Sequence, residues 1–389
     1  MKRALFSFGS AAVLTGLLAY MGVLNGNWFA PAHTSGSSAE SWAGDGFTVG
    51  IVWPPGKGRT FVHGAQLAWE EINNGTGPLR EKIRLRVMEE KRPEDGAAVA
   101  KRMAADDSVI AVIGHDSFES AIPASLVYEQ RKVLFITPKA TGPQLTEHGF
   151  QYVFRLTPDD RAIASAIAVA AKNLKANKVA VLYARSRHGE SVVPQFLAVA
   201  GDENIEIPFV RSYVAGRDWK HQDFRPLLAE ARQTEFDAIL IVDELPRLAK
   251  VLTDAQQMGV TQPVLATDKA DSVQLWELAG SAADNVYVTS AVDPSSPTPE
   301  YRAFKERFTS RYGEEPGYAA SQGYEAFSLL VNAVMASRSA DPLVLATTLR
   351  LNSWKGLFGE FSFTLQGDVV GRKISIKRMK DGRFSTVRF

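Results

Sequence analysis

Polar side chains follow two apolar runs in the first third of the chain, at the points where predicted strands end. The runs 109–113 and 133–136 are almost entirely apolar, as in parallel strands that are covered by helices on both faces. Ligands of such sheets bind outside the carboxyl ends of the strands. The residues just beyond, 115–117 and 137–141, are therefore the first candidates for ligand contact.

Further acidic and hydroxyl side chains lie where other predicted strands or helices end or begin. Asp268 ends an apolar strand, and it either caps the helix that follows or faces a cleft at the strand end. Asp159 and Asp160 follow Pro158 and are expected to cap the next helix, where a carboxylate also favours the helix dipole. Ser191 has no G-x-S-x-G frame around it, so we interpret it as a residue near a helix N-terminus rather than a nucleophile.

The sequence gives weaker support for a phosphate-binding loop or a metal site. The loop 54–60, PPGKGRT, has neither the P-loop spacing nor the dinucleotide fingerprint, and we expect a solvated basic turn. If the loop instead contacts an anion, Lys57 and Arg59 suit a ligand with an extra acidic group. The six histidines have no metal-ligand spacing and no cysteine is present, so no metal or cofactor is predicted. We expect His115 to be a hydrogen-bonded structural residue, whereas His188 is equally suited to a structural or a binding role.

The hydrophobic pattern predicts alternating strands and helices that would position these residues. Predicted strands cover 47–53, 83–88, 109–113, 133–136, 178–183, 238–242 and 264–267. Predicted helices cover 64–73, 94–107, 160–174, 190–200, 222–232, 245–258, 300–312 and 318–337. Strands 359–364 and 369–377 and a final hairpin at 381–382 close the chain. Trp69, Trp276 and Tyr324 are expected in the core.

Length and composition exclude several classes of protein. The 389 residues are 45% apolar and 22% charged, which is typical of a soluble globular protein with room for two domains. The net charge is +1 and no long basic run occurs, so a nucleic-acid partner is not expected.

The N-terminus has the features of an export signal. Lys2 and Arg3 precede a mostly apolar run at 4–24, and Ala30-Pro31-Ala32 offers a cleavage site. Residues 1–32 are either a cleaved signal peptide, which we favour, or a retained membrane anchor, since the run is just long enough to span a bilayer. Residues 33–46 are rich in Ser, Gly and Ala and are interpreted as a linker, so the fold is expected to start near residue 47.

An ordered series of motifs resembles one known family. The series consists of VIGH followed by a polar turn and SAIPAS, then FITPKATGPQLTE, FRLTPDD, VAVLYARSRHGES, VLATDKADSVQLWELAG and GYAASQGYEAFSLL. It is similar to the periplasmic substrate-binding proteins of branched-chain amino acid ABC transporters, over residues 47–389. The resemblance implies an α/β fold with two Rossmann-like lobes of parallel sheets, joined by three crossover strands. Lobe one would be 47–159 plus 291–370, and lobe two 160–290 plus 371–389.

The resemblance also implies two retained ligand contacts. The threonine that binds the α-carboxylate and ammonium of an amino acid corresponds to Thr141, and the acid that pairs with the ammonium corresponds to Asp268. Lys139 replaces a small residue whose carbonyl faces the ammonium, and Ala140 lies between Lys139 and Thr141. A carboxylate binds hydroxyl and backbone N–H donors, and an ammonium in a closed cleft binds an acid, so a zwitterion fits this set.

Other positions depart from the family pattern. The serine that caps the ligand carboxylate corresponds to Phe118, with Ser117 and Ser120 nearby as substitutes. The family's aromatic contact corresponds to His188, and the loop 54–60 is shorter than usual. These changes make leucine, isoleucine or valine a poor match for the site.

The resemblance implies an exported, non-enzymatic, monomeric binding protein of the periplasm. It would capture an amino-acid-like or carboxylated solute between its lobes by hinge closure and deliver it to an ABC permease of the inner membrane. A first alternative is a periplasmic sensor that presents the bound solute to a membrane signalling receptor, which a retained anchor would favour. A second alternative is an enzyme on a doubly wound fold, although nucleotide, nucleophile and metal motifs are missing.

Overall fold

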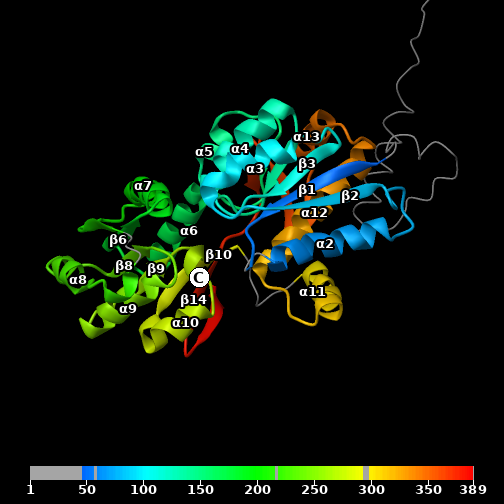
Figure 1. Cartoon of the computed structure of the whole chain (residues 1–389). Helices are drawn as coiled ribbons and strands as arrows, with labels where there is room; N and C mark the ends of the chain where they lie inside the picture. The colour runs from blue at the N-terminus through cyan, green and yellow to red at the C-terminus, as the bar shows by residue number, and fades with distance from the viewer. Residues whose placement is uncertain (1–45, 57–58, 215–217, 292–297, 389) are drawn as a thin grey trace, which may run out of the picture.

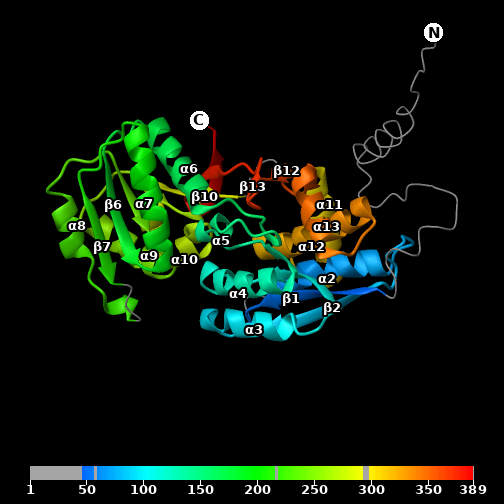
Figure 2. The ribbon, with the colours of Figure 1, turned by 90° about the horizontal axis from the view of Figure 1, so that it is seen from above.

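Two α/β lobes lie side by side in the computed structural model, which describes residues 46–56, 59–214, 218–291 and 298–388 (Figures 1 and 2). The predicted export segment 1–32 and the linker up to residue 45 lie outside the described residues. The first strand begins at Phe47, where the sequence predicts the start of the fold.

Lobe one is built on a parallel sheet with the strand order β2-β1-β3-β4-β5. Its strands are β1 Phe47–Trp53, β2 Ile83–Glu89, β3 Val109–Gly114, β4 Leu134–Thr137 and β5 Val153–Arg155. Its helices are α2 Arg59–Asn73, α3 Gly96–Met103, α4 Phe118–Arg131, α5 Gln144–Glu147, α11 Pro299–Tyr312, α12 Tyr318–Ser337 and α13 Pro342–Leu351, with a 3-10 turn at Pro93–Asp95. A small antiparallel sheet consists of β11 Trp354–Gly356, β12 Gly359–Phe363 and β13 Val369–Val370.

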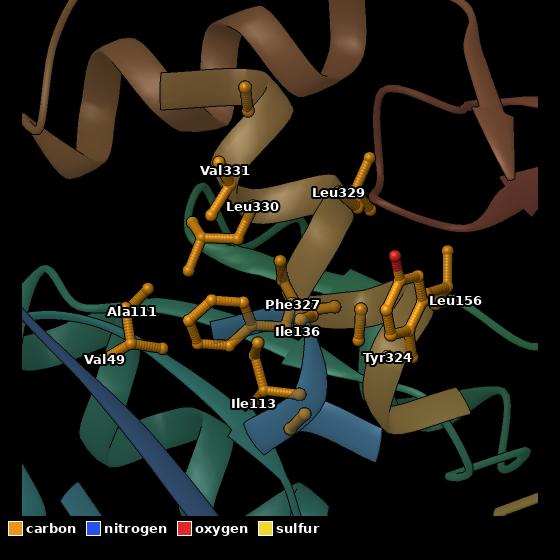
Figure 3. Close-up of a cluster of buried hydrophobic side chains, with 14 of the residues drawn as sticks. Val49, Ala111, Ile113, Ile136, Leu156, Tyr324, Phe327, Leu329, Leu330 and Val331 are labelled. Carbon is orange, nitrogen blue, oxygen red and sulfur yellow. The ribbon is translucent and has the colours of Figure 1, made fainter. Parts of the chain in front are cut away.

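The core of lobe one forms between the parallel sheet and α12. Figure 3 shows Val49, Ile113 and Ile136 of the strands facing Phe327 and Leu330 of the helix, and all five side chains are fully buried. Burial of such side chains contributes about 1.5–3 kcal/mol each, so this layer is a main source of the lobe's stability.

Among the described residues no single helix is long and apolar enough to cross a membrane. The helices α12 and α13 meet that test only when they are taken together, as a pair that is bent by 98°.

Lobe two has a sheet with the order β15-β14-β10-β9-β8-β6-β7. Its strands are β6 Val179–Arg185, β7 Val210–Val214, β8 Ala238–Val242, β9 Val264–Ala266, β10 Val286–Ser290, β14 Ser375–Lys380 and β15 Arg383–Val387. Its helices are α6 Asp160–Asn173, α7 Arg187–Asp202, α8 Arg225–Ala231, α9 Arg247–Gln257 and α10 Gln274–Ala279, with 3-10 turns at Trp219–His221, Asp268–Ala270 and Gly280–Ala283. The strands β6 to β10 are parallel, and β14 joins β10 antiparallel.

The chain passes between the lobes three times, and one passage corrects a prediction. The passages follow β5, β10 and β13, so the fold class expected from the resemblance is confirmed. A single strand at 369–377 was predicted, but β13 ends at Val370 and β14 begins at Ser375. The residues between them cross from one lobe to the other, because β13 pairs with β12 in lobe one and β14 with β10 in lobe two.

Candidate functional site

The strand ends that face the second lobe come from β3 and β4, which are neighbours in the sheet of lobe one. The segment after β3 leads into α4, and the segment after β4 contains residues 138–142. Phe118 at the start of α4 lies against this second segment, because a Cβ on Gly142 would be 3.2 Å from its ring. The two segments therefore form one surface, as the parallel-sheet pattern predicts.

Two serines near the start of α4 have different environments. Ser117 precedes the helix in extended conformation, and its hydroxyl caps no N–H group of the helix. Ser120 is fully buried, and its Oγ donates to the carbonyl oxygen of Ser117 at 3.0 Å. Ser117 thus keeps a hydroxyl at the helix N-terminus, while the hydroxyl of Ser120 is occupied inside lobe one.

Lys139 forms an ion pair with Asp116, which lies within the candidate range 115–117. Its Nζ lies 2.6 Å from Oδ1 of Asp116, which follows β3, and 6.0 Å from the centroid of the Trp53 ring. The side chains of Lys139 and Asp116 are 40% and 34% exposed. The pair ties together the ends of β3 and β4, and it neutralises the charge that the lysine brings to the expected ammonium position.

Buried Arg155 supports the loop that contains Ala140 and Thr141. Its Nη1 donates to the carbonyl oxygen of Gly142 at 2.6 Å, and its Nη2 donates to Oγ1 of Thr146 at 2.8 Å. The guanidinium also pairs with Asp368, to which Nε donates at 2.9 Å. Because one rigid cation serves several acceptors, it fixes the backbone on which Thr141 sits.

Asp160 connects Thr141 of lobe one to lobe two. Its backbone N–H donates to the carbonyl oxygen of Thr141 at 2.9 Å, and its Oδ2 accepts from Oγ of Ser191 in α7 at 2.5 Å. Burial raises the pKa of Asp160, and the negative charge of Asp268 acts in the same direction. The hydroxyls of Ser191 and Thr141 lower the pKa, but by less. Of the two expected caps, Asp159 is confirmed, since its Oδ1 accepts from the N–H of Ala162, whereas the Asp160 side chain bonds to Ser191 instead.

His188 and Asp268 meet at the end of β9. Nε2 of His188 lies 3.0 Å from Oγ1 of Thr267, and the histidine is 4% exposed. Burial, aided by the positive charge of Lys269, lowers the pKa of His188 to about 4, so the ring is neutral at pH 7. Asp268 opens a 3-10 turn after β9, and its buried Oδ1 has no hydrogen-bond partner among the described residues.

Lys269 carries a second positive charge into the cleft. Burial alone would lower the pKa of Lys269. The nearby carboxylates have the larger combined effect and raise this pKa; they belong to Asp268, Glu244, Asp116 and Asp160. Asp116 belongs to lobe one and the lysine to lobe two, so Lys269 interacts electrostatically across the cleft. Lys269 was not recognisable from its residue type, because an isolated lysine is usually solvated. Its position directly after Asp268 at a strand end was the available signal.

The candidate site residues therefore form two neighbouring groups and do not surround one point. Thr141, Asp160, Asp268, Lys269 and His188 form a chain of contacts and charge interactions between the lobes. Ser117, Phe118 and Lys139 lie on the lobe-one surface beside it, whereas Ser120 and Ala140 are fully buried beneath that surface. Arg155 and Lys269 were not selected from the sequence, and Asp160 was selected only as a helix cap.

Other expectations about individual residues have clear outcomes. His115 is structural as predicted: it is fully buried, with Nδ1 2.5 Å from Oε2 of Glu90 and Nε2 3.1 Å from the Tyr128 hydroxyl. The core clusters include Tyr324, and Trp69 and Trp276 pack against them, which confirms that prediction.

The basic loop at 54–60 is described only in part. Lys57 lies outside the described residues, and Nε of Arg59 donates to His63. Within the described residues, no group of three or more His, Asp or Glu side chains could hold a metal ion.

The low pKa of His188 predicts a pH-dependent stability. Unfolded histidine takes up a proton near pH 6.5, whereas folded His188 resists protonation down to about pH 4. Between these values the unfolded chain binds more protons, so stability falls as the pH falls, by about 3 kcal/mol at most. We expect His188→Gln to remove this part of the pH dependence. Urea unfolding of both proteins at pH 7 and near pH 4 measures it, and parallel pH profiles would contradict the assignment.

Comparison with known proteins now defines the class. The model of the periplasmic binding protein family matches residues 56–383, and the chain belongs to this family. Its relatives include the leucine-, isoleucine-, valine-, threonine-, and alanine-binding protein of Pseudomonas aeruginosa, 24% identical over 348 residues, which are 88% of this chain and 92% of the relative. Leu/Ile/Val-binding protein homolog 1 of Brucella suis is 28% identical over 338 residues, 85% of this chain and 88% of the relative.

A solved structure that is similar to this chain belongs to the same class of protein as the sequence relatives. An ABC transporter substrate-binding protein from Desulfitobacterium hafniense in complex with Leu has a TM-score of 0.75 and 29% identity, and the match covers 88% of this chain and 99% of that chain. The resemblance to substrate-binding proteins of branched-chain amino acid transporters is confirmed. The comparisons give no support to a signalling role.

Proposed function

We propose that this protein is exported to the periplasm, captures an amino-acid-like solute between its lobes and presents it to an ABC permease. It acts as a monomer and closes about its hinge on the solute, with the lobes divided as the sequence predicts. It binds the solute without converting it. The relatives named above bind amino acids or are named for doing so, which supports this solute class.

The observation that carries the proposal is the pair of unpartnered carboxylate oxygens at the junction of the lobes. Oδ1 of Asp160 and Oδ1 of Asp268 are buried, and neither has a hydrogen-bond partner among the described residues. A buried acceptor without a donor costs about 1–3 kcal/mol, so such groups commonly serve a ligand. An ammonium group carries three donors and a positive charge, and it would satisfy both oxygens at once.

The rest of the site suits the remainder of an amino acid. The hydroxyls of Thr141 and Ser117 and the N-terminus of α4 offer donors to a carboxylate on the lobe-one side. Neutral His188 contributes a ring without a charge, and its buried Nδ1 has no partner in the described part of the chain. Closure that removes water strengthens each of these contacts.

A solute screen tests the proposal. A solute that binds only the folded state raises the melting temperature of the purified protein. We expect at least one L-amino acid to do so, while its decarboxylated amine and its deaminated acid have much weaker effects. Chromatography after prolonged incubation is expected to recover the solute unchanged. A response to sugars but to no amino acid, or conversion of the solute, would refute the proposed function.

A further inference from the structure

Glu244 lies at a strand end next to the proposed ammonium site. It follows β8, which pairs in parallel with β9 in the sheet of lobe two (Figure 1), and the pairing joins Ile241 to Ala266. The same register, extended past the ends of both strands, brings Glu244 next to Lys269, and these two charges interact. Neighbouring strands are about 4.8 Å apart, so Glu244 and Asp268 belong to the same edge of the sheet, where ligands bind.

The backbone at Glu244 is held by the buried carboxylate of the preceding residue. Asp243 is 2% exposed, and its Oδ1 accepts the N–H of Glu244 at 2.7 Å. Its Oδ2 accepts the hydroxyl of Tyr213 at 2.7 Å and Nε of Arg247 at 2.6 Å. Because one buried acceptor group fixes the turn after β8, Glu244 has a defined position at the strand end.

The carboxylate of Glu244 is accessible to a solute. The residue is exposed, and within the described part of the chain its side chain forms no ion pair and accepts no hydrogen bond. The nearest arginine along the chain, Arg247, is bonded to Asp243 instead. Glu244 therefore has its full capacity as an acceptor for a cation.

The described residues of the cleft carry more negative than positive charge. Four carboxylates interact with Lys269, and they belong to Asp116, Asp160, Asp268 and Glu244. The second lysine of this group is Lys139, which is paired with Asp116 at 2.6 Å. Two negative charges are left in excess when all four acids are ionised, and one is left when Asp160, whose pKa is raised, is protonated. An amino acid with a neutral side chain has no net charge and leaves this excess in place.

Two acids of this group have oxygens that no described residue satisfies. Asp160 is fully buried, and its Oδ1 has no hydrogen-bond partner in the described part of the chain. Oδ1 of Asp268 is buried and unpartnered in the same sense. Carboxylates that are removed from water are costly unless cations pair with them. A solute with two positive groups therefore compensates the closed cleft better than a solute with one.

We propose that Glu244 is a second acidic contact for the solute, and that the protein selects amino acids with a positively charged side chain. This inference rests on the proposed function. The α-ammonium group lies between Asp160 and Asp268, and the side-chain cation of the solute lies against Glu244 at the neighbouring strand end. Closure of the lobes removes water around this contact and strengthens it.

Calorimetric titration with matched pairs of amino acids tests this selectivity. The pairs are L-lysine with L-norleucine, L-ornithine with L-norvaline, and L-arginine with L-citrulline, and the second member of each has no side-chain charge. We expect one basic amino acid to bind at least about 10-fold more tightly than its neutral partner, because its second charge meets a carboxylate. The preference is expected to shrink at high salt, since Glu244 is exposed in the free protein.

The outcomes separate this inference from the proposed function. Equal or tighter binding of a neutral or acidic amino acid would refute the second acidic contact and leave the proposed function intact. Absence of binding by every amino acid would overturn both.

Two variants assign the preference to Glu244. Glu244→Gln keeps the shape of an exposed side chain, and we expect it to lose about 10-fold in affinity for the preferred basic amino acid and little for its neutral partner. Glu277→Gln removes an exposed acid from α10 of the same lobe and is expected to leave both affinities unchanged. An equal loss for the basic and the neutral amino acid in Glu244→Gln would show that Glu244 is structural only. Wild-type selectivity in that variant, or the same loss in Glu277→Gln, would refute the contact.

Discussion

Asp268→Ala is expected to lower the affinity for an amino-acid ligand by about 2–5 kcal/mol, which is roughly 30- to 4,000-fold. The ammonium group of the ligand would lose the acidic partner at the end of β9, inside a cleft where water cannot replace it. Oδ1 of Asp268 is buried and has no hydrogen-bond partner in the described residues, so the free protein loses no hydrogen bond at this oxygen when the side chain is removed. Isothermal titration calorimetry with the amino acid found in the screen measures the effect.

Two further variants show whether the loss is specific. Glu277→Ala removes an exposed acid from α10 of the same lobe, and it is expected to leave the affinity unchanged. Thr141→Val removes a hydroxyl from the lobe-one side of the cleft while keeping the shape of the side chain, and it is expected to weaken carboxylate binding. Wild-type affinity in Asp268→Ala would refute the assignment of the ammonium site and with it the zwitterion model.

Arg155→Met is expected to destabilise lobe one by about 3–5 kcal/mol, because it removes the buried half of an ion pair. The guanidinium is fully buried and bonds to Asp368, to the Gly142 carbonyl and to Thr146, so all three acceptors lose a donor together. Urea unfolding measures the change in the free energy of unfolding. Since the same bonds hold the loop of Thr141, a weaker affinity for the solute is expected as well.

An exposed ion pair provides the control for this substitution. Arg80 lies 3.2 Å from Glu81, and both side chains are more than half exposed, at 61% and 75%. Exposed pairs contribute about 0–1 kcal/mol, so Arg80→Met is expected to have little effect. A destabilisation by Arg155→Met as small as that of Arg80→Met would show that Asp368 and the loop find other partners.

The fold was predictable wherever the hydrophobic pattern is strong. The predicted bounds of β1, β8 and α12 agree with the structure, because long apolar runs at one period define buried strands and helices. The short strands β5, β7 and β10 and the helix α13 were not predicted. The strand β8 is equally short but entirely apolar, whereas β5, β7 and β10 include polar or charged residues. The helix α13 follows a helix of similar composition.

The break between β13 and β14 shows a different kind of limit. The residues 369–377 were predicted as a single strand, but their pairing partners are β12 in one lobe and β10 in the other. Strand pairing between residues far apart in the chain decides where such a strand is divided. Gly371, which has a φ of 88°, was a local signal of the break, but it does not specify the pairing partners.

By itself, the sequence determined the alternation of strands and helices, the family, and the strand ends that bear Thr141, His188 and Asp268. Those features depend on local composition and spacing, which are readable along the chain. Only the tertiary structure decided which polar groups are buried without partners and which charges meet across the lobes. Asp160 and Lys269 were not recognisable as residues of the cleft, because burial and the distance to distant carboxylates arise only when the two lobes are assembled.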